Sequence, residues 1–316
     1  MYFLGVDGGG TKCRARLVAE DGRVLGEGLS QTANVTAGVE KSFNAIMASV
    51  EAAVAKAGLD SRIYPDCVAG CGIAGANIQD LKAALTAMPF PFRKVSLESD
   101  AYAAWLGAHH PDDGAILIAG TGSAGFARIG ERIKTLGGWG FAVSDSGSGA
   151  HMGQRLIRTA LLCHERIRPA SELTEKVMAR FGSDPQALVA WSETALPRDY
   201  AAFAPMVVAA AQRDDPVGQE ILAESLKEIE ELLLALSNLG AQRICLLGGL
   251  SEIYVPLLSA DIRSLLVEPR TDAMGGAIIM ARGALEDAGR SDAGKLDAGK
   301  LDAGKSDAGD SGAGGA

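Results

Sequence analysis

The stretch DGGGTKCRAR, residues 7–16, decides the fold of this chain, because it connects two strand-like runs through a glycine-rich turn. Tyr2–Val6 before the glycines is apolar, and Thr11–Ala19 alternates apolar with charged or polar side chains. This period of two is typical of a half-buried strand. Asp21-Gly22 is a turn signal, and Val24–Leu29 continues as a third strand. The chain therefore opens with a predicted antiparallel meander of three strands.

Helical and strand patterns alternate after the meander. Apolar residues recur at the spacing of one helix face through residues 43–54. The elements expected next are a buried strand at Cys67–Ile73, a helix at Asp80–Met88, a strand at Val95–Leu97 and a helix at Tyr102–Ala108. Together these elements predict a βββαβαβα lobe built on a mixed sheet.

The same pattern restarts near Gly114. Strands at Ala115–Ala119 and Gly125–Ile129 flank a second glycine turn, and a third strand follows at Arg132–Leu136. The remaining expected elements are helices at Ala150–Cys163, Glu172–Phe181, Pro185–Thr194, Ala202–Arg213 and Val217–Leu239, a strand at Ile244–Leu247 and a last helix at Met274–Leu285. This repetition predicts an internal duplication into an N-terminal lobe, residues 1–113, and a C-terminal lobe, residues 114–285. The last helix is a candidate to pack back on the first lobe.

Composition agrees with two globular lobes. Of the 316 residues, 47% are apolar and 22% are charged, which excludes collagen, a disulfide scaffold and a mainly disordered chain. The net charge of −9 argues against nucleic acid or an anionic membrane as the main partner, because both bind basic faces. Five irregularly spaced cysteines predict reduced thiols. Since no signal peptide or membrane span is apparent, we expect a cytoplasmic protein.

Residues 286–316 form an imperfect Asp-Ala-Gly-Lys repeat with seven acidic and four basic side chains. The repeat has almost no apolar side chain beyond alanine, so we expect a disordered low-complexity tail. Within it, Gly299–Ser306 matches the Walker A pattern. A phosphate loop needs a strand before it and a helix after it, and neither is predicted here. We interpret the match as a chance product of the repeat.

A second nucleotide motif is also misleading. Gly120–Gly125 has the spacing of the dinucleotide fingerprint, and Asp145 follows at a suitable distance. However, these glycines lead into a predicted strand, whereas the fingerprint needs a helix whose N-terminus holds the pyrophosphate. We therefore do not expect a nicotinamide cofactor.

The two glycine turns make better sense as a pair. Glycine lets a backbone approach phosphate oxygens closely and point N–H groups at them, while threonine and serine add hydroxyl donors. A third glycine motif, Gly248-Gly249, follows the strand Ile244–Leu247 and suits the close approach of a nucleoside. The predicted ATP-binding residues are Gly9, Gly10, Thr11, Lys12, Gly120, Thr121, Gly122, Ser123, Gly248 and Gly249. Asp7, at the end of the first strand, is the candidate ligand of a hydrated Mg²⁺.

These motifs resemble the actin-like ATPase superfamily of sugar kinases and, within it, the BadF/BadG/BcrA/BcrD ATPase family, which includes the N-acetylglucosamine kinases. Further stretches resemble the bacterial glucosamine kinases: SDSGSGAHMGQRLI at 144–157, AWSETALPRDY at 190–200 and GAQRICLLG at 240–248. The likeness covers about residues 1–285. It implies an α/β, two-lobed actin-like ATPase (ribonuclease H-like) fold, with duplicated βββαβαβα lobes and an interlobe cleft. It also implies a homodimer, with ATP and a sugar as small-molecule partners and with Mg²⁺.

The resemblance assigns roles to individual residues. Asp100 matches the catalytic aspartate, which removes the proton of the sugar 6-hydroxyl; its alternative role is a helix N-cap. The predicted substrate-binding residues are Asn34, Asp100, Gly138, Trp139, Asp145 and Ser148. Trp139 is alternatively a buried packing aromatic, and Ser148 is alternatively an N-cap.

One departure bears on the substrate. Kinases for the acetylated sugar carry Gly-Asp-Glu-Gly-Ser where this chain has Ser144–Ser148, so the glutamate is replaced by Ser146. This difference and the 190–200 stretch favour phosphorylation of D-glucosamine at the 6-hydroxyl. N-acetylglucosamine kinase is the alternative. A dehydratase-activating ATPase of the same family is disfavoured, because Leu117 and Ile118 stand where it needs an iron–sulfur cysteine.

Overall fold

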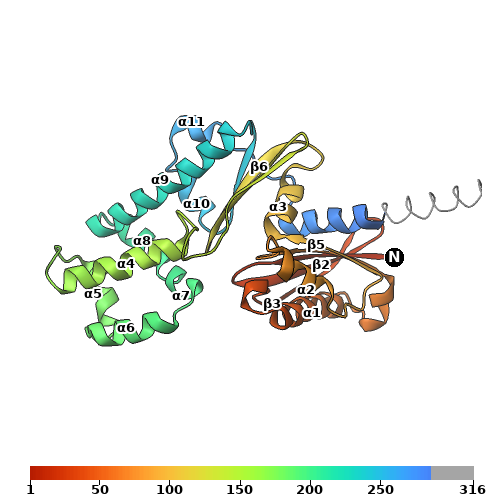
Figure 1. Ribbon diagram of the computed structural model, residues 1–316, viewed down its shortest axis with the longest axis horizontal. Helices are drawn as coiled ribbons and strands as arrows, with labels where there is room; N and C mark the ends of the chain where they lie inside the picture. Colours follow the sequence, from red (N-terminus) through yellow and green to blue (C-terminus); the bar gives the residue numbers. More distant parts are fainter. Residues whose placement is uncertain (286–316) are drawn as a thin grey trace, which may run out of the picture.

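The computed structural model describes residues 1–285, which form two lobes, each with its own sheet (Figure 1). The tail 286–316, with its Walker A string at residues 299–306, lies outside the described residues. None of the helices in the described part has the length and apolar content needed to cross a membrane.

The first sheet has five strands in the order β3-β2-β1-β4-β5. The strands are β1 (Tyr2–Gly8), β2 (Lys12–Ala19), β3 (Val24–Gln31), β4 (Cys67–Ile73) and β5 (Lys94–Ser99). The meander β1-β2-β3 is antiparallel, and β4 and β5 extend the sheet in parallel on the other side of β1. The interior strand β4 is buried along its whole length, as expected for a parallel strand covered on both faces.

Three helices connect and cover these strands: α1 (Val39–Lys56), α2 (Gln79–Thr86) and α3 (Asp100–His109). Two 3₁₀ turns, η1 (Val35–Ala37) and η2 (Ser61–Asp66), precede α1 and β4. Helix α1 packs with Ile46 and Val50 against Leu17 and other residues of the first sheet. The predicted βββαβαβα order of this lobe is confirmed.

The second sheet repeats the first with the order β8-β7-β6-β9. Its strands are β6 (Gly114–Ala119), β7 (Ser123–Ile129), β8 (Arg132–Gly137) and β9 (Ile244–Leu247). The antiparallel meander and the parallel β6–β9 pair correspond to β1-β2-β3 and to the β1–β4 pair. Beyond β9 the repeat is reduced, because the place of a fifth strand is taken by an isolated parallel bridge between Ile244 and Leu266.

The second lobe carries more helices than the first. They are α4 (Gly149–His164), α5 (Glu172–Ala179), α6 (Pro185–Thr194), α7 (Pro197–Ala201), α8 (Ala204–Ala211), α9 (Pro216–Asn238), α10 (Ser251–Tyr254) and α11 (Ala260–Arg263). The prediction of one helix at Ala202–Arg213 was wrong in its start. Pro205 lacks an N–H and fits only in the first turn of a helix, so the new helix α8 begins at Ala204.

A last helix, residues 273–285, returns to the first lobe, where Figure 1 draws it in blue beside β5 and α3. Its Ile278 and Ala281 pack against Phe3 of β1 and Val68 of β4. Arg16 of β2 forms a bidentate ion pair with Asp272, with Nη–Oδ distances of 2.8 and 2.7 Å, just before this helix begins. The helix therefore covers one face of the first sheet.

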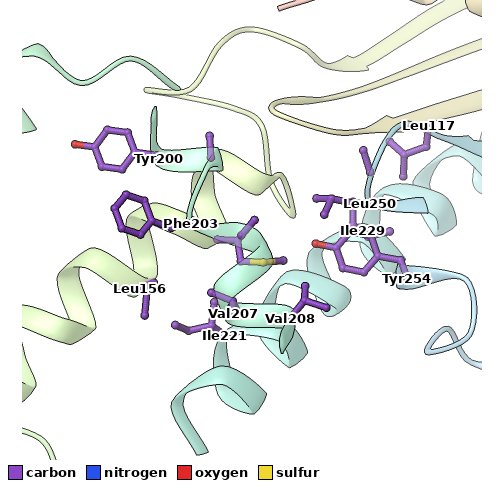
Figure 2. Close-up of a cluster of buried hydrophobic side chains, with 14 of the residues drawn as sticks. Leu117, Leu156, Tyr200, Phe203, Val207, Val208, Ile221, Ile229, Leu250 and Tyr254 are labelled. Carbon is purple, nitrogen blue, oxygen red and sulfur yellow. The ribbon is translucent and has the colours of Figure 1, made fainter. Parts of the chain in front are cut away.

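Two buried clusters matter for the site. The largest fills the second lobe between its sheet and helices; Figure 2 shows Tyr200 and Phe203 at one end of it and Ile229 and Tyr254 at the other. A smaller cluster lies at the junction of the lobes, where α3 contributes the fully buried Trp105 and β7 contributes Phe126. This junction connects α3, at whose start Asp100 stands, to the second sheet.

Candidate active site

The first glycine turn leads from β1 into β2. The Gly9 N–H donates to the Lys12 carbonyl at 3.0 Å, and no heavy atom lies within 4 Å of the position that a Cβ would take at Gly10. Asp7, next to the end of β1, accepts from Arg14, whose Nη2 lies 2.6 Å and whose Nε lies 3.2 Å from Asp7 Oδ2. The two residues face each other in the β1–β2 register. The turn is open at its tip, with a carboxylate and a guanidinium at its base.

The second glycine turn leads from β6 into β7 and is held by hydrogen bonds from the start of helix α4. Its Gly120 and Thr121 carbonyls accept from the Gly149 and Ala150 N–H groups at 2.8 and 3.1 Å, at the start of α4. Its Gly120 N–H also donates to Gly122 O at 2.9 Å. Because the glycines continue into a strand and not into a helix, the dinucleotide interpretation is excluded by the geometry.

The two turns meet across the lobes. The Thr11 and Thr121 hydroxyl oxygens are 3.0 Å apart although 110 residues separate them in the sequence. The structure thus brings together the two phosphate motifs that the sequence predicted separately. Both threonines stand on glycine-rich backbone, so their N–H and O–H groups can face one ligand from two sides.

Asp100 is the first residue of α3, and its neighbour Ser99 is the N-cap that accepts from the Tyr102 N–H at 3.1 Å. The capping alternative for Asp100 is therefore wrong, and its carboxylate accepts from the adjacent Ala101 N–H at 2.9 Å. Burial, and to a lesser extent the negative charge of Asp7, raise the pKa of Asp100 to about 6. A carboxylate of this basicity is well matched to general-base work near neutral pH.

Asp145 is buried in the loop before α4 and has a φ of 69°. This left-handed backbone is uncommon for a residue with a side chain and marks a position that its surroundings impose. Asp145 lies against the second turn, since a Cβ at Gly122 would be 2.8 Å from its Oδ2. Burial raises its pKa, which a hydrogen bond from the Ser123 N–H opposes. The second glycine turn and Asp145, the predicted sugar ligand, are therefore in direct contact.

Ser148, in the same loop, is fully buried and caps α4 by accepting from the His151 N–H at 3.3 Å. The structure supports the capping interpretation of this residue. Asn34 is half-buried and uses its Oδ1 for the Thr36 N–H and hydroxyl, at 3.0 and 2.8 Å. Its side-chain NH₂ group forms no hydrogen bond with the described residues, which leaves it able to donate to a sugar hydroxyl.

Trp139 is 65% exposed, so the interpretation as a buried packing aromatic is wrong. It stands in a loop whose glycines Gly137, Gly138 and Gly140 all have positive φ, between 67° and 98°. The loop is anchored by Phe141, whose ring packs against those of Tyr200 and His151 at centroid distances of 5.2 and 5.3 Å. Trp139 is thus an exposed aromatic carried by an anchored loop.

The third glycine motif lies beside the second turn. Gly248 has a φ of 96°, and a Cβ there would be 2.3 Å from the Ala119 carbonyl, so only glycine fits. Leu250 N–H donates to the same carbonyl at 3.1 Å. No heavy atom lies within 4 Å of the Cβ position of Gly249. The predicted nucleoside motif is therefore adjacent to the predicted phosphate motif.

The residues that support the predicted site residues and their loops were not identified from the sequence. Arg14 was inferable, because it alternates with the apolar residues of β2 and faces Asp7 in a hairpin register. Glu228 and Tyr254 could not be found in this way, because they reach the 145–148 loop from helices α9 and α10, and neither could Arg155 of α4, which pairs with Glu228.

The carboxylate of Asp7 is suited to a metal ion that is held mainly by phosphate and water. No group of three or more histidine, cysteine or acidic side chains that could form a complete metal site occurs within residues 1–285. Arg14 occupies Asp7 Oδ2, and Oδ1 forms no side-chain hydrogen bond with the described residues. Mg²⁺ keeps several waters and typically uses one or two protein carboxylates plus substrate phosphates, so Asp7 fits this role.

Comparison with known proteins identifies relatives over almost the whole described chain. Residues 4–281 match the model of the BadF/BadG/BcrA/BcrD ATPase family. The chain is 41% identical over 280 residues to glucosamine kinase GspK of Vibrio cholerae serotype O1, which covers 89% of this chain and 95% of that protein. It is 31% identical to the N-acetylmuramic acid/N-acetylglucosamine kinase of Clostridium acetobutylicum, over 51% of this chain and 53% of that protein.

Solved structures share the fold. A candidate N-acetylglucosamine kinase from Chromobacterium violaceum has a TM-score of 0.83 at 33% identity, covering 89% of this chain and 98% of that one. A ROK family glucokinase from Streptomyces griseus, in complex with glucose and AMPPNP, has a TM-score of 0.56 at 20% identity with the same coverage. The second likeness shows the fold alone. The predicted two-lobed actin-like ATPase fold is confirmed.

Proposed function

Because the chain belongs to the BadF/BadG/BcrA/BcrD ATPase family, we propose that it is an ATP-dependent glucosamine kinase. The reaction transfers the γ-phosphoryl group of ATP to the 6-hydroxyl of D-glucosamine and gives glucosamine 6-phosphate and ADP. The observation that carries this proposal is the meeting of the two glycine turns at Thr11 and Thr121, in a chain 41% identical to a glucosamine kinase over 95% of that protein.

The first step that the residues perform is positioning of ATP. The Gly10 N–H group and the hydroxyls of Thr11 and Thr121 would surround the phosphates from both lobes, while Gly9 and Gly120, whose N–H groups bond within the turns, allow the backbone to approach closely. Lys12 adds a positive charge beside them. Gly248 and Gly249 leave room for the nucleoside, next to the end of β6. Phosphoryl transfer is catalysed largely by such positioning and by neutralisation of charge.

Asp7 is the residue that we propose to hold Mg²⁺ through water. When bound, the ion supplies charge neutralisation on the transferring phosphoryl group. Arg14 orients the Asp7 carboxylate from one side and leaves Oδ1 free of side-chain partners within the described residues.

The sugar would be held between the lobes by Asn34 from the first lobe and by Asp145 and the Gly138–Trp139 loop from the second. Asp100 would take the proton of the 6-hydroxyl as the oxygen attacks the γ-phosphorus, and ADP leaves on the opposite side. A pKa of about 6 keeps most Asp100 side chains ionised at pH 7. Ser148, which caps α4, acts through the loop backbone and not as a direct ligand in this conformation.

A coupled assay of ADP release tests this function. Glucosamine, N-acetylglucosamine, glucose and a reaction without sugar are compared at equal concentration. We expect glucosamine to give the highest kcat/KM. Turnover that occurs only without sugar would remove the kinase function, and a preference for N-acetylglucosamine would assign the chain to the alternative activity.

Two further properties follow from the family resemblance as proposals: the protein acts in the cytoplasm and forms a homodimer. All five cysteines are free and buried, which suits a reducing compartment. Light scattering coupled to gel filtration measures the oligomeric state, and a mass equal to that of one chain at micromolar concentration would contradict the dimer.

A further inference from the structure

The backbone of Gly147, in the loop that carries Asp145, is held through both its N–H and its carbonyl group by side chains from distant helices. Its N–H donates to Glu228 Oε2 of α9 at 2.6 Å, and its carbonyl accepts from the Tyr254 hydroxyl of α10 at 2.7 Å. These partners lie 81 and 107 residues further along the chain. One residue in a short loop thus carries two long-range tertiary hydrogen bonds through its backbone.

Glu228 and Tyr254 together form a clamp on Gly147, and further contacts fix this clamp in place. Arg155 of α4 pairs with both oxygens of Glu228 and lies 3.4 Å from Glu224. Tyr254 is fully buried and lies next to Ile229 in the core of the second lobe (Figure 2). Gly147 itself has a φ of 69°, and a Cβ there would be 2.6 Å from Ile229, so the loop is pressed onto α9.

This arrangement imposes the backbone of the predicted sugar ligand. Asp145 stands two residues before Gly147 and also has a φ of 69°. A left-handed aspartate persists where the surrounding structure determines it. On the C-terminal side of Asp145, this backbone is held by the two hydrogen bonds of Gly147 and by the Ser148 cap of α4.

The same clamp reaches the nucleotide motif. Tyr254 ends α10, which begins directly after Gly248, Gly249 and Leu250. Leu250 N–H donates to Ala119 O at the end of β6, immediately before the second glycine turn. A nucleotide that shifts or orders Gly249 would therefore act on a helix of four residues whose last residue, Tyr254, bonds to the loop of Asp145. Such a continuous set of contacts can carry coupling between two ligands.

We propose that Glu228 and Tyr254 are positioning residues that hold the Asp145 loop through the Gly147 peptide and couple sugar binding to nucleotide binding. The inference rests on the proposed function, because it takes the occupant of the Asp145 side as the sugar and that of the Gly249 side as ATP. Neither residue is assigned a contact with a reacting atom.

Calorimetric titration of the full chain with glucosamine tests the proposal, with and without a non-hydrolysable ATP analogue. Tyr254→Phe removes one hydroxyl, and Glu228→Gln keeps an acceptor for Gly147 but loses the charge that pairs with Arg155. We expect Tyr254→Phe to weaken glucosamine binding about tenfold in the presence of the analogue and to reduce the strengthening that the analogue gives to sugar binding. Glu228→Gln should have the same direction and a smaller size.

The matched control is Glu220→Gln, on the same helix α9 but in an exposed pair with Arg168. It should leave sugar affinity and coupling as in the wild type. Affinity for the analogue alone should stay within about twofold in all three variants, which shows that they are folded.

The outcomes separate the two claims. If wild-type protein binds neither glucosamine nor another sugar of the assay panel, the proposed function fails and the inference falls with it. If the wild type shows coupling and Tyr254→Phe and Glu228→Gln retain it unchanged, the inference alone is overturned. Loss of analogue affinity equal to the loss of sugar affinity would also overturn it, because it would indicate general destabilisation in place of loop positioning.

Discussion

The two glycine turns are equivalent in the duplicated topology, yet they differ in what surrounds them. The first, between β1 and β2, has charged residues at its base and tip: Asp7, Lys12 and Arg14. The second, between β6 and β7, has no charged residue of its own and is bonded to the start of α4 and to the Asp145 loop. One turn supplies charge and the other supplies position.

This difference shows how a duplicated fold can divide the work of phosphoryl transfer. Asp100 belongs to the lobe of the first turn, and the charge of Asp7 contributes to its raised pKa. Asp145 and the Trp139 loop belong to the lobe of the second turn. Changes at Asp7, Arg14 and Asp100 should therefore affect the chemical step and metal dependence, whereas changes at Asp145 and in its loop should affect sugar binding.

The largest expected effect is that of Asp100→Asn. The amide cannot take the proton of the sugar hydroxyl, so kcat should fall at least about a thousandfold. ATP binding, measured with a non-hydrolysable analogue, should stay within about twofold because Asp100 is not part of either turn. A kcat within tenfold of wild type would remove Asp100 from the role of base.

The next effect is that of Gly122→Ala in the second turn. The added Cβ would lie 2.8 Å from Asp145 Oδ2, so it must displace that side chain. A displacement of about 1 Å in a positioned group can cost about a hundredfold, and we expect a loss of this size in kcat/KM for the sugar. Gly283→Ala is the control, since its Cβ would meet no atom within 4 Å in the last helix. An unchanged sugar KM in Gly122→Ala would show that the second turn does not position Asp145.

The pH dependence of kcat/KM follows from the first lobe. Asp100 must be ionised to act as a base, and its pKa is raised to about 6. Activity should therefore fall as pH drops through 6 and reach about a tenth at pH 5. A profile that remains flat down to pH 4.5 would mean that Asp100 ionises like an exposed aspartate.

The same raised pKa has a consequence for stability. A carboxyl whose folded-state pKa is raised favours its protonated form in the folded state, so its contribution to stability is present at low pH and is lost as pH rises through about 6. Asp100→Asn should therefore raise Tm by about 2 °C at pH 8 and have less effect at pH 5. Differential scanning fluorimetry at both pH values gives the comparison.

The smallest expected effect is that of Arg14→Gln in the first turn. The Asp7–Arg14 pair is partly solvent-exposed, so its loss should cost about 1 kcal/mol and raise KM for MgATP about fivefold. The Mg²⁺ concentration needed for half-maximal binding of ADP, measured by calorimetry, should rise with it, while the sugar KM stays constant. A rise in the sugar KM instead would contradict the division between the two turns.

Local patterns predicted much of the fold. The strand Cys67–Ile73 and the helix Pro185–Thr194 have the predicted bounds, because a fully apolar run and a Pro-initiated helix are decided by local sequence. The short helices α10 and α11 were missed, since four residues are too few for a periodic signal. The Leu266 bridge that replaces a fifth strand depends on tertiary packing and had no signal of its own.

For the site, the glycine turns could be found because their residue types and spacing are typical of phosphate binding, whereas Asp100 was singled out by the family resemblance, since a helix N-cap explained it equally well from the residues alone. Trp139 could not be placed inside or outside from the sequence, since an aromatic between glycines suits either. Glu228 and Tyr254 bond to the backbone N–H and carbonyl of Gly147, in the loop of Asp145. A helix residue whose side chain binds a distant backbone group leaves no local pattern in the sequence. The proposed ligand-binding residues are therefore more predictable here than the residues proposed to hold them in place.

The proposed reaction of this chain is phosphorylation of glucosamine at the 6-hydroxyl. The most direct test is a competition in which equal concentrations of glucosamine and N-acetylglucosamine share limiting ATP, with the products identified by mass and by phosphorus–proton NMR correlation. We predict that glucosamine 6-phosphate is the main product and that its formation depends on Asp100. N-acetylglucosamine 6-phosphate as the main product, or phosphate on another oxygen of glucosamine, would contradict the account.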